Sequence, residues 1–390
     1  MADLYGRAPL LHFSNILSTV ASFLSAVSPN VGILLIGRVL MGVAGCVPTT
    51  IGGSVVADLI PAEKRGTLMS LWACGPLLGS VVGPIIGGYI SFDIGWRWAL
   101  RMECILCGLS ILAGFMIFQE THGPTVIRKI KSNSLYSQRH NVMPDKTGSQ
   151  QARWEDIRKA IVRSVILQTT SPVVIIASIY TSTAFTFMYF TITTFPILFG
   201  NEYGFNEAQI GLTYIGQGLG FASGQLAGPA LDWYIKQQRA KNGHSRPKDR
   251  LPAIVPGCLL IAIGLLWYGW SAQARLHWVM PIIGSGLSAA GITVVFAGIQ
   301  TYLIDAFTAY AASVIAANVT VRSIFGTVMP LGAPPLYARF GYGWGNSMLA
   351  LIALGLIPVV AILYHYEKLW KMLNPRGQPS WTHPKEVVDC

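Results

Sequence analysis

Long apolar stretches separated by short polar connections dominate the chain. An α-helix needs about 20 consecutive apolar residues to cross the hydrocarbon core of a bilayer. Stretches of about this length cover residues 10–28, 32–57, 66–91, 96–118, 171–199, 208–231, 252–271, 277–304, 312–335 and 345–366. The pattern therefore predicts an all-α, polytopic membrane protein with about ten transmembrane helices.

The predicted spans fall into two groups on either side of a polar stretch. We divide the chain into an incomplete N-terminal half of four spans, a central loop, a C-terminal half of six spans and a tail, at residues 1–118, 119–170, 171–366 and 367–390. Asp58 ends the second span, and Asp305 ends the eighth span in the same way. Secondary transporters are often built from two repeated halves of this kind, so the pattern favours a transporter.

The distribution of charge predicts the orientation. Only 12% of the residues are charged, whereas a soluble domain has about 25%. The net charge is +11, and 22 of the 28 Lys and Arg residues lie in alternate connections, starting with the N-terminus. This positive-inside pattern places both termini and the 119–170 loop in the cytoplasm, and we expect a multi-pass protein of the plasma membrane. It also argues against a nucleic-acid partner, because the basic residues follow the connections between spans.

A basic segment within the central loop allows two interpretations. In residues 153–163 and just beyond, Ile157, Ile161 and Val165 recur every four residues among Arg and Lys. This spacing fits an amphipathic helix that lies on the inner leaflet and is attracted to anionic lipid. It equally fits a solvated linker helix.

A glycine-rich stretch in the third span is the most specific segment of the sequence. Gly75, Gly79, Gly83 and Gly87 recur every four residues, and Pro84 removes a backbone donor between them. Small residues at this spacing let helix backbones approach closely in lipid. The stretch is therefore either an ordinary packing face or a smooth surface along which a neighbouring helix slides.

Four segments carry the motifs of one transporter family. They are Gly79-x-x-x-Gly83-Pro84-x-x-Gly87-Gly88, Arg38-x-x-x-Gly42-x-x-Gly45, Asp3-x-x-Gly6-Arg7 and Gly228-x-x-x-Asp232. With these segments the chain resembles the major facilitator superfamily, and within it the drug:proton antiporter branch found in fungi. The first segment is similar to the antiporter motif of that branch, although Ser70 stands where the longer motif has a glycine.

The resemblance implies the major facilitator fold and transport by alternating access. Protons moving inward would drive efflux of a small, rather apolar organic compound, such as a drug, toxin or secondary metabolite. By this alignment the first span is family helix three, so the chain holds helices three to twelve and lacks the first two. We expect a monomer whose partners are protons, a small-molecule substrate and the lipid bilayer.

Two charged residues are candidates for proton coupling. Arg38 lies inside its span, where a charge is costly and usually functional, and the resemblance implies a role in coupling. The alternative for Arg38 is a structural bond to a backbone carbonyl. Glu103 enters its span from the outer side, where it either carries the proton or pairs with Arg101 or Arg97.

The resemblance also implies a gate on the cytoplasmic side. In the family, contacts of the loop motifs hold the two halves closed on that side, and the matching residues are Asp3, Gly6, Arg7, Gly228 and Asp232. A carboxylate at this place can accept bonds from the exposed donors of a helix N-terminus. The alternative is an exposed ion pair with little effect on stability.

A substrate cavity is expected on the family helices that line the centre. The candidates are Tyr180, Phe187, Phe296, Gln300 and Arg322. Apolar walls with a few polar groups suit a hydrophobic organic ligand, although each aromatic residue can also be ordinary packing. Arg322 either holds an anionic group or locks two helices together.

Other classes of function find little support in the sequence. It contains no G-x-x-x-x-G-K-[ST] loop for nucleotide phosphates, and no metal cluster or catalytic triad is recognisable. We therefore expect no enzyme, no cofactor and no metal. An uptake carrier for a nutrient or polyamine and a truncated, transport-inactive product stay open as alternatives. The antiporter glycines argue against the uptake carrier, and the missing helices favour the truncated product.

Overall fold

The computed structural model describes residues 7–59, 65–117, 158, 162–242, 247–307 and 311–373. All regular elements in this part of the chain are helices. They form two compact units. The first unit consists of Met1–Val55 and Ile94–Val162, and the second unit consists of Val56–Asp93 and Arg163–Cys390. The basic segment 153–163 lies almost entirely outside the described residues.

The first unit contains three helices, α2 (Arg7–Ala26), α5 (Trp96–Ile117) and most of α3 (Val31–Leu59). Small hydroxyl side chains join them. Ser14 donates a hydrogen bond to the carbonyl of Ala44 across 2.8 Å, and the Ser22 hydroxyl lies 3.5 Å from the sulfur of Cys107. Such bonds suit helices in lipid, where apolar contact alone gives little driving force for association.

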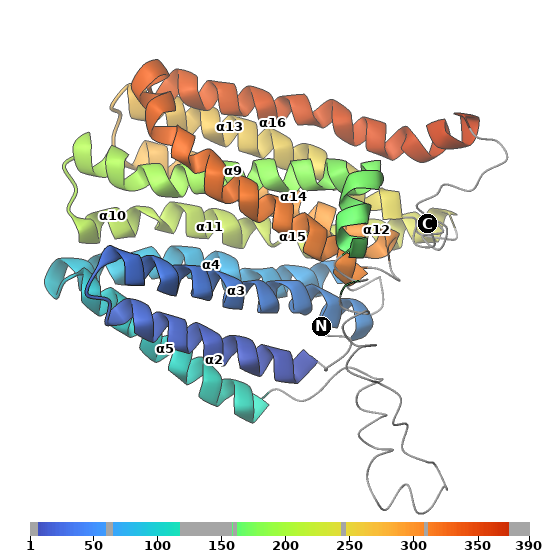
Figure 1. Ribbon diagram of the computed structural model, residues 1–390. Coiled ribbons are helices and arrows are strands. Elements are labelled where there is room, and N and C mark those ends of the chain that lie inside the picture. The colour runs from blue at the N-terminus through green and yellow to red at the C-terminus, as the bar shows by residue number, and fades with distance from the viewer. Residues whose placement is uncertain are drawn as a thin grey trace, which may run out of the picture. The chain divides into compact units, whose positions relative to one another are not determined.

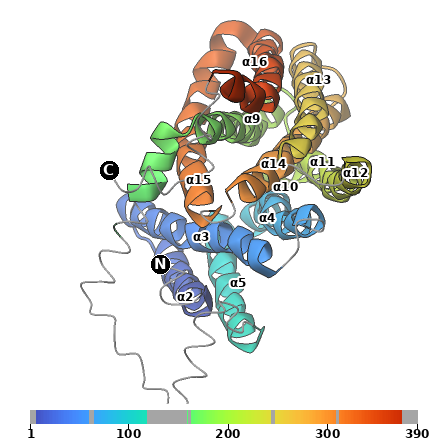
Figure 2. The ribbon, with the colours of Figure 1, turned by 90° about the vertical axis from the view of Figure 1, so that its right-hand side faces the viewer.

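The second unit contains the remaining helices (Figures 1 and 2). They are α4 (Arg65–Asp93), α9 (Pro172–Asn201), α10 (Glu207–Thr213), α11 (Ile215–Gly224), α12 (Ala227–Asn242), η2 (Pro247–Ala253), α13 (Ile254–Gln273), α14 (Val279–Ala306), α15 (Ala311–Val328), η4 (Met329–Gly332) and α16 (Ala333–Leu373). By its contacts α4 belongs to this unit, although it precedes α5 in the sequence.

The all-α fold class is confirmed, and most helices match the predicted spans. The predicted span 208–231 is instead divided among α10, α11 and the start of α12, and α16 begins at Ala333, inside the predicted span 312–335. Six described segments are long and apolar enough to cross a membrane: Val31–Pro48, Trp96–Met116, Pro172–Asn201, Arg250–Gln273, Val279–Ala306 and Ser313–Val360. The last segment covers two predicted spans, because α15 and α16 follow each other without a polar loop. Within α16 the backbone turns at Gly341, where φ is 73°, a value that glycine adopts without steric cost.

Local sequence signals explain several helix boundaries. Pro172 begins α9, where a missing N–H is harmless. At the start of α10, the side-chain oxygen of Asn206 accepts a hydrogen bond from the backbone N–H of Gln209. The side-chain oxygen of Gln209 accepts one from the backbone N–H of Asn206. This reciprocal capping box satisfies donors that the helix itself leaves free.

Glycines bring the helices of the second unit into backbone contact. A Cβ atom at Gly224 on α11 would lie 2.6 Å from the carbonyl oxygen of Ala290 on α14. Gly220 and Gly216, one and two turns earlier, face α14 with equally little space. Small residues at this spacing are what close packing in lipid requires, so the α11–α14 contact depends on them.

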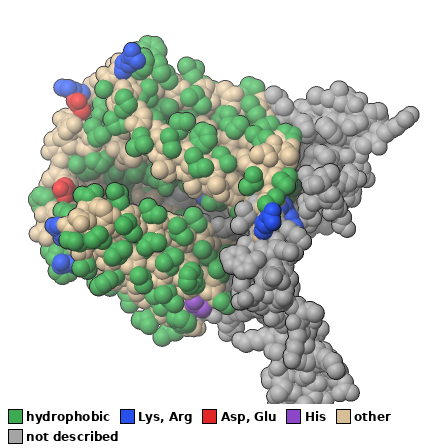
Figure 3. All heavy atoms as spheres, in the orientation of Figure 1, with side chains coloured by type: hydrophobic (Ala, Val, Ile, Leu, Met, Phe, Trp, Pro, Cys, Tyr) green, Lys and Arg blue, Asp and Glu red, His purple; other side chains and the backbone are tan. Residues whose placement is uncertain are grey.

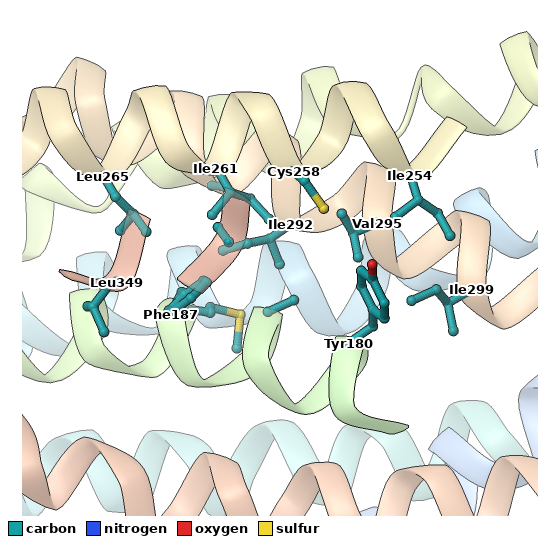
Figure 4. Close-up of a cluster of buried hydrophobic side chains, with 14 of the residues drawn as sticks. Tyr180, Phe187, Ile254, Cys258, Ile261, Leu265, Ile292, Val295, Ile299 and Leu349 are labelled. Carbon is teal, nitrogen blue, oxygen red and sulfur yellow. The ribbon is translucent and has the colours of Figure 1, made fainter. Parts of the chain in front are cut away.

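The core of the second unit lies between α9, α13, α14 and α16 (Figure 4). Tyr180 and Phe187 on α9 point toward α13, where Cys258 and Ile261 lie, and Val295 of α14 closes the space between them. These side chains are almost fully buried. The surface has the opposite character to that of a soluble protein, because hydrophobic side chains cover the face shown in Figure 3 and the few charged ones lie near helix ends. Such a surface is suited to lipid.

We predict that Gly224→Ala destabilises the protein by about 1–3 kcal/mol, because the methyl group meets backbone atoms that cannot move aside. Gly355→Ala on α16 is the matched control, since no described atom lies within 4 Å of its Cβ position. Thermal unfolding of both purified variants in detergent measures the effect. Equal melting temperatures would show that the α11–α14 contact does not depend on Gly224.

Candidate functional site

The first unit joins the two residues predicted to couple protons. Arg38 on α3 donates hydrogen bonds to both carboxylate oxygens of Glu103 on α5, with its Nη1 atom 3.1 Å from Oε2 and 3.3 Å from Oε1. Arg38 lies seven residues after Val31, where α3 begins, and Glu103 lies seven residues after Trp96, where α5 begins. The pair therefore lies at one depth, about 10 Å from the start of each helix.

The Arg38–Glu103 pair is neither buried nor fully exposed. The side chains are 45% and 36% exposed, respectively. The two arginines considered as alternative partners of Glu103 lie elsewhere, because Arg97 stacks over Trp96 at 4.5 Å and Arg101 stacks over Trp98 at 4.9 Å. Glu103 is thus held by Arg38, which the sequence reasoning had not paired with it.

The antiporter motif on α4 has two different faces. A Cβ atom at Gly88 would lie 2.6 Å from the carbonyl oxygen of Glu207, and one at Gly211 would lie 2.6 Å from that of Pro84. Gly88 and Pro84 therefore form the contact with α10. An added Cβ atom would have no described neighbour within 4 Å at the other motif glycines, which are Gly75, Gly79, Gly83 and Gly87. They lie outside the face that contacts α10, since successive residues turn by about 100° around the helix.

Asp232, one of the predicted gate residues, binds the beginning of α4. Its carboxylate accepts hydrogen bonds from both the backbone N–H and the hydroxyl of Thr67, each at 2.7 Å. Asp232 lies on α12, follows Gly228 by four residues and is 4% exposed. The contact satisfies a donor of the first turn of α4 with a negative charge, which also suits the helix dipole.

Arg250 connects this contact to a second carboxylate. Its Nε atom lies 2.6 Å from Oδ2 of Asp305, and its Nη1 atom lies 3.8 Å from Oδ1 of Asp232. The Arg250 side chain is 1% exposed. A buried cation between two carboxylates is costly to disrupt, because removal of one partner leaves charge without compensation. The sequence reasoning noticed Asp305 as part of a repeat but did not single out Arg250.

The predicted cavity residues separate into two groups. Tyr180 and Phe187 are 1% and 2% exposed and belong to the core, and the Tyr180 hydroxyl donates a hydrogen bond to the carbonyl of Leu356. Phe296, Gln300 and Arg322 lie on α14 and α15 instead. Both rings pack within the hydrophobic core and the Tyr180 hydroxyl already has a partner, so the site that we build below does not use them.

Arg322 lies against two aromatic rings from other helices. The central carbon of its guanidinium group is 4.0 Å from the ring centre of Phe185 on α9 and 5.2 Å from that of Phe296 on α14. The two rings are 5.6 Å apart and tilted by 48°. Phe185 was missed at the sequence level because the cavity face of α9 was assigned from Tyr180, seven positions before Phe187.

Polar atoms without a hydrogen bond lie on the same helices. The side-chain oxygens of Ser182 and Thr186 on α9 and of Gln300 on α14 are buried, and none has a hydrogen-bond partner among the described residues. One turn along α15 from Arg322, Asn318 donates to Thr181 across 2.9 Å and to Ser178 across 3.4 Å. Burial of an unbonded polar group costs about 1–3 kcal/mol, so these oxygens are candidates for ligand contacts.

Three predicted gate residues cannot be placed. Asp3 and Gly6 lie outside the described residues, and Arg7 begins α2 with its side chain outside them. Among the residues that the structure does describe, no group of three or more His, Cys, Asp or Glu is arranged to hold a metal ion. The candidate sites are thus the Arg38–Glu103 pair, the Asp232 network and the surroundings of Arg322.

Comparison with known proteins decides the family. The family model of the Major Facilitator Superfamily matches residues 1–330. This chain belongs to the major facilitator superfamily. It is a membrane transporter of a family that acts on small molecules, rather than an enzyme.

Fungal members of the superfamily resemble this transporter over nearly its whole length. "MFS transporter cpaT" of Aspergillus oryzae is 39% identical over 97% of this chain and 77% of its own length. "Efflux pump radE" of Floropilus chiversii is 37% identical over 97% of this chain and 71% of its own. "MFS-type transporter penM" of Penicillium rubens is 37% identical over 94% of this chain and 72% of its own.

Solved structures agree with the fold of the transporter. A double tryptophan mutant of XylE has a TM-score of 0.64 at 15% identity, over 93% of this chain and 80% of that chain. The proton:xylose symporter XylE bound to 6-bromo-6-deoxy-D-glucose has a TM-score of 0.60 at 15% identity, with the same coverage. The expected major facilitator fold is therefore confirmed, and the expectation of two helices ahead of the chain stays a prediction.

We predict that Asp305→Asn destabilises the transporter by about 3 kcal/mol or more, since it leaves the buried Arg250 with weaker compensation. Glu202→Gln is the matched control. It makes the same chemical change in an ion pair with Arg275, whose side chain is 73% exposed, where a loss of about 0–1 kcal/mol is expected. Chemical unfolding of the purified variants compares them. Equal losses would contradict a structural role for the Arg250 network.

Proposed function

We propose that this transporter exports small, rather apolar organic compounds in exchange for protons. The names of its relatives, one of them an efflux pump at 37% identity, support export as the direction. The antiporter motif on α4 supports proton exchange. We further propose a plasma-membrane location with both termini and the 119–170 loop in the cytoplasm, from the distribution of Lys and Arg.

The ion pair between Arg38 and Glu103 carries the proposal for proton coupling. A carboxylate that binds a proton loses its charge, and its attraction to the arginine then falls to that of a neutral hydrogen bond. Arg38 on α3 would thereby be released from α5, and deprotonation of Glu103 would restore the pair. Because both side chains are partly exposed, protons have access to this switch.

The Asp232 network supports a gating role for the beginning of α4. Two hydrogen bonds from Thr67 hold this helix to Asp232 of α12. Hydrogen bonds of this kind can break and form again. Farther along the helix, Gly88 of α4 and Gly211 of α10 keep α4 close to α10. In our proposal the Thr67–Asp232 contact opens and closes during the transport cycle, while the glycine contact maintains the alignment of α4.

The test is efflux from yeast cells that lack their own drug pumps and express the chain. Cells are loaded with a neutral, a cationic or an anionic dye (Nile red, rhodamine 6G or fluorescein). We expect faster loss of at least one dye than in cells with empty vector, and we expect a protonophore to abolish the difference. Net accumulation of dye, or efflux that is indifferent to the protonophore, would contradict proton-driven export.

We predict that Glu103→Gln uncouples export from the proton gradient, because glutamine keeps the shape of the side chain but cannot titrate. Arg101→Gln is the control, since this arginine is exposed and stacks over Trp98 rather than binding Glu103. Initial efflux rates at external pH 5 and 7 are compared at equal membrane abundance. A pH dependence of Glu103→Gln that equals that of Arg101→Gln would leave Glu103 as a structural residue.

We predict that a cysteine at position 93 is labelled from outside intact cells by a membrane-impermeant maleimide. Asp93 is the exposed last residue of α4, and the positive-inside pattern places this end outside. The native cysteines are first replaced by serine. A cysteine at position 236, on α12 where Lys236 is exposed, should react only after the cells are opened. The reverse labelling pattern would invert the proposed orientation.

A further inference from the structure

Arg322 is a charged residue within a membrane-spanning helix, and its surroundings bear on the chemical class of the substrate. The residue is 8% exposed and lies about two thirds of the way along α15 (Ala311–Val328). The sequences of α9, α11 and α13 contain no Asp, Glu, Lys or Arg, and Arg322 is the single such residue in α15. A charge at this place in a membrane-spanning helix is costly, and it usually serves transport.

Two aromatic rings lie against the guanidinium group of Arg322. Its central carbon lies over the ring of Phe185 at 4.0 Å and over the ring of Phe296 at 5.2 Å. Stacked guanidinium groups keep their N–H donors in the molecular plane, where they match the geometry of a carboxylate. The rings therefore favour a planar, oxygen-bearing anion that approaches the edge of Arg322.

Two buried oxygens next to the rings favour a ligand that also donates a hydrogen bond. Gln300 follows Phe296 by one helical turn and is 4% exposed, and Ser182 precedes Phe185 by one turn and is 1% exposed. Residues at these spacings share a helix face. The Oε1 atom of Gln300 and the Oγ atom of Ser182 have no hydrogen-bond partner among the described residues, and a ligand hydroxyl or amide would supply one.

We propose that the transported compound is an organic anion with an apolar body, whose carboxylate or enolate oxygens bind Arg322. A hydroxyl or amide N–H of the same compound donates to Gln300, and the apolar body contacts Phe185 and Phe296. The proposal rests on the function above, in which the chain carries small organic compounds. It disfavours polyamines as substrates, because their positive charges would be placed next to an arginine.

Binding to the purified full chain in lipid nanodiscs tests the substrate class without a proton gradient. The probes are 1-pyrenebutyrate, which is anionic, and 1-pyrenebutanol, which has the same apolar body and no charge. Fluorescence titrations are corrected with empty nanodiscs. We expect the anion to bind at least about tenfold more tightly than the alcohol, as a charge-assisted bond in a dry site allows. Equal affinities would overturn the proposal.

Variants separate recognition of the anion from a purely structural role of Arg322. Arg322→Gln should remove the preference for the anion and change the affinity for the alcohol by less than about twofold, because only the charge-assisted bonds are lost. Arg339→Gln removes the same charge from an exposed position of α16 and should leave the preference unchanged. If Arg322→Gln weakens both probes equally, or if Arg339→Gln also removes the preference, Arg322 does not select anions.

The outcomes also distinguish this inference from the proposed function. A preference for pyrenebutyrate that depends on Arg322, in a chain without proton-driven efflux, would reject export and keep the anion site. Proton-driven efflux of Nile red or rhodamine 6G by a chain without this preference would keep export and reject the anion site. Gln300→Leu provides a check that does not alter the charge, because it should weaken a hydroxyl-bearing anion more than pyrenebutyrate itself.

Discussion

Close backbone contact at glycines is the constraint on which the second unit depends. In a bilayer every helix must satisfy its own backbone, and apolar side chains gain little by leaving lipid for protein. Association then relies on how near two helices can come. The α11–α14 contact at Gly216, Gly220 and Gly224, and the contact of Gly88 with α10, provide this proximity. The core around Tyr180 and the polar groups on α9 and α14 take their positions from these contacts.

Three charged clusters then serve different purposes within this apolar frame. Arg250 lies between two carboxylates, and removal of one of these charges is expected to destabilise the protein. Among the described residues Arg38 pairs with Glu103, and both side chains are partly exposed, so in the proposed mechanism a proton changes this pairing. Arg322 lies against the rings of Phe185 and Phe296. In the proposed function the second arginine changes its pairing with a proton and the third binds the substrate, whereas the first holds helices together.

The sequence predicted the class of fold and most helices, because the length of an apolar stretch directly reports a bilayer crossing. It could not predict which side chains face one another. Phe187 was selected for the cavity and Phe185 was not, since the choice depends on how α9 is rotated against α13 and α15, which is a property of tertiary packing. The Arg38–Glu103 pair could have been predicted from the sequence, because the two residues lie at equal distances from the starts of their helices and hence at one depth. Nothing along the chain joined Arg250 to Asp232, which only the close approach of η2 and α12 brings about.

The equal depth of Arg38 and Glu103 has an electrical consequence. As a pair they carry no net charge, so the membrane potential does little work on them. In the proposed mechanism a proton on Glu103 would leave one uncompensated positive charge about 10 Å from the helix starts, which is roughly a third of a core of about 30 Å. Moving one charge across the whole field changes its energy by about 2.3 kcal/mol per 100 mV, so a charge a third of the way across changes by about 0.8 kcal/mol per 100 mV. The voltage across the membrane, and not only the pH difference, would then influence how long the protonated state persists.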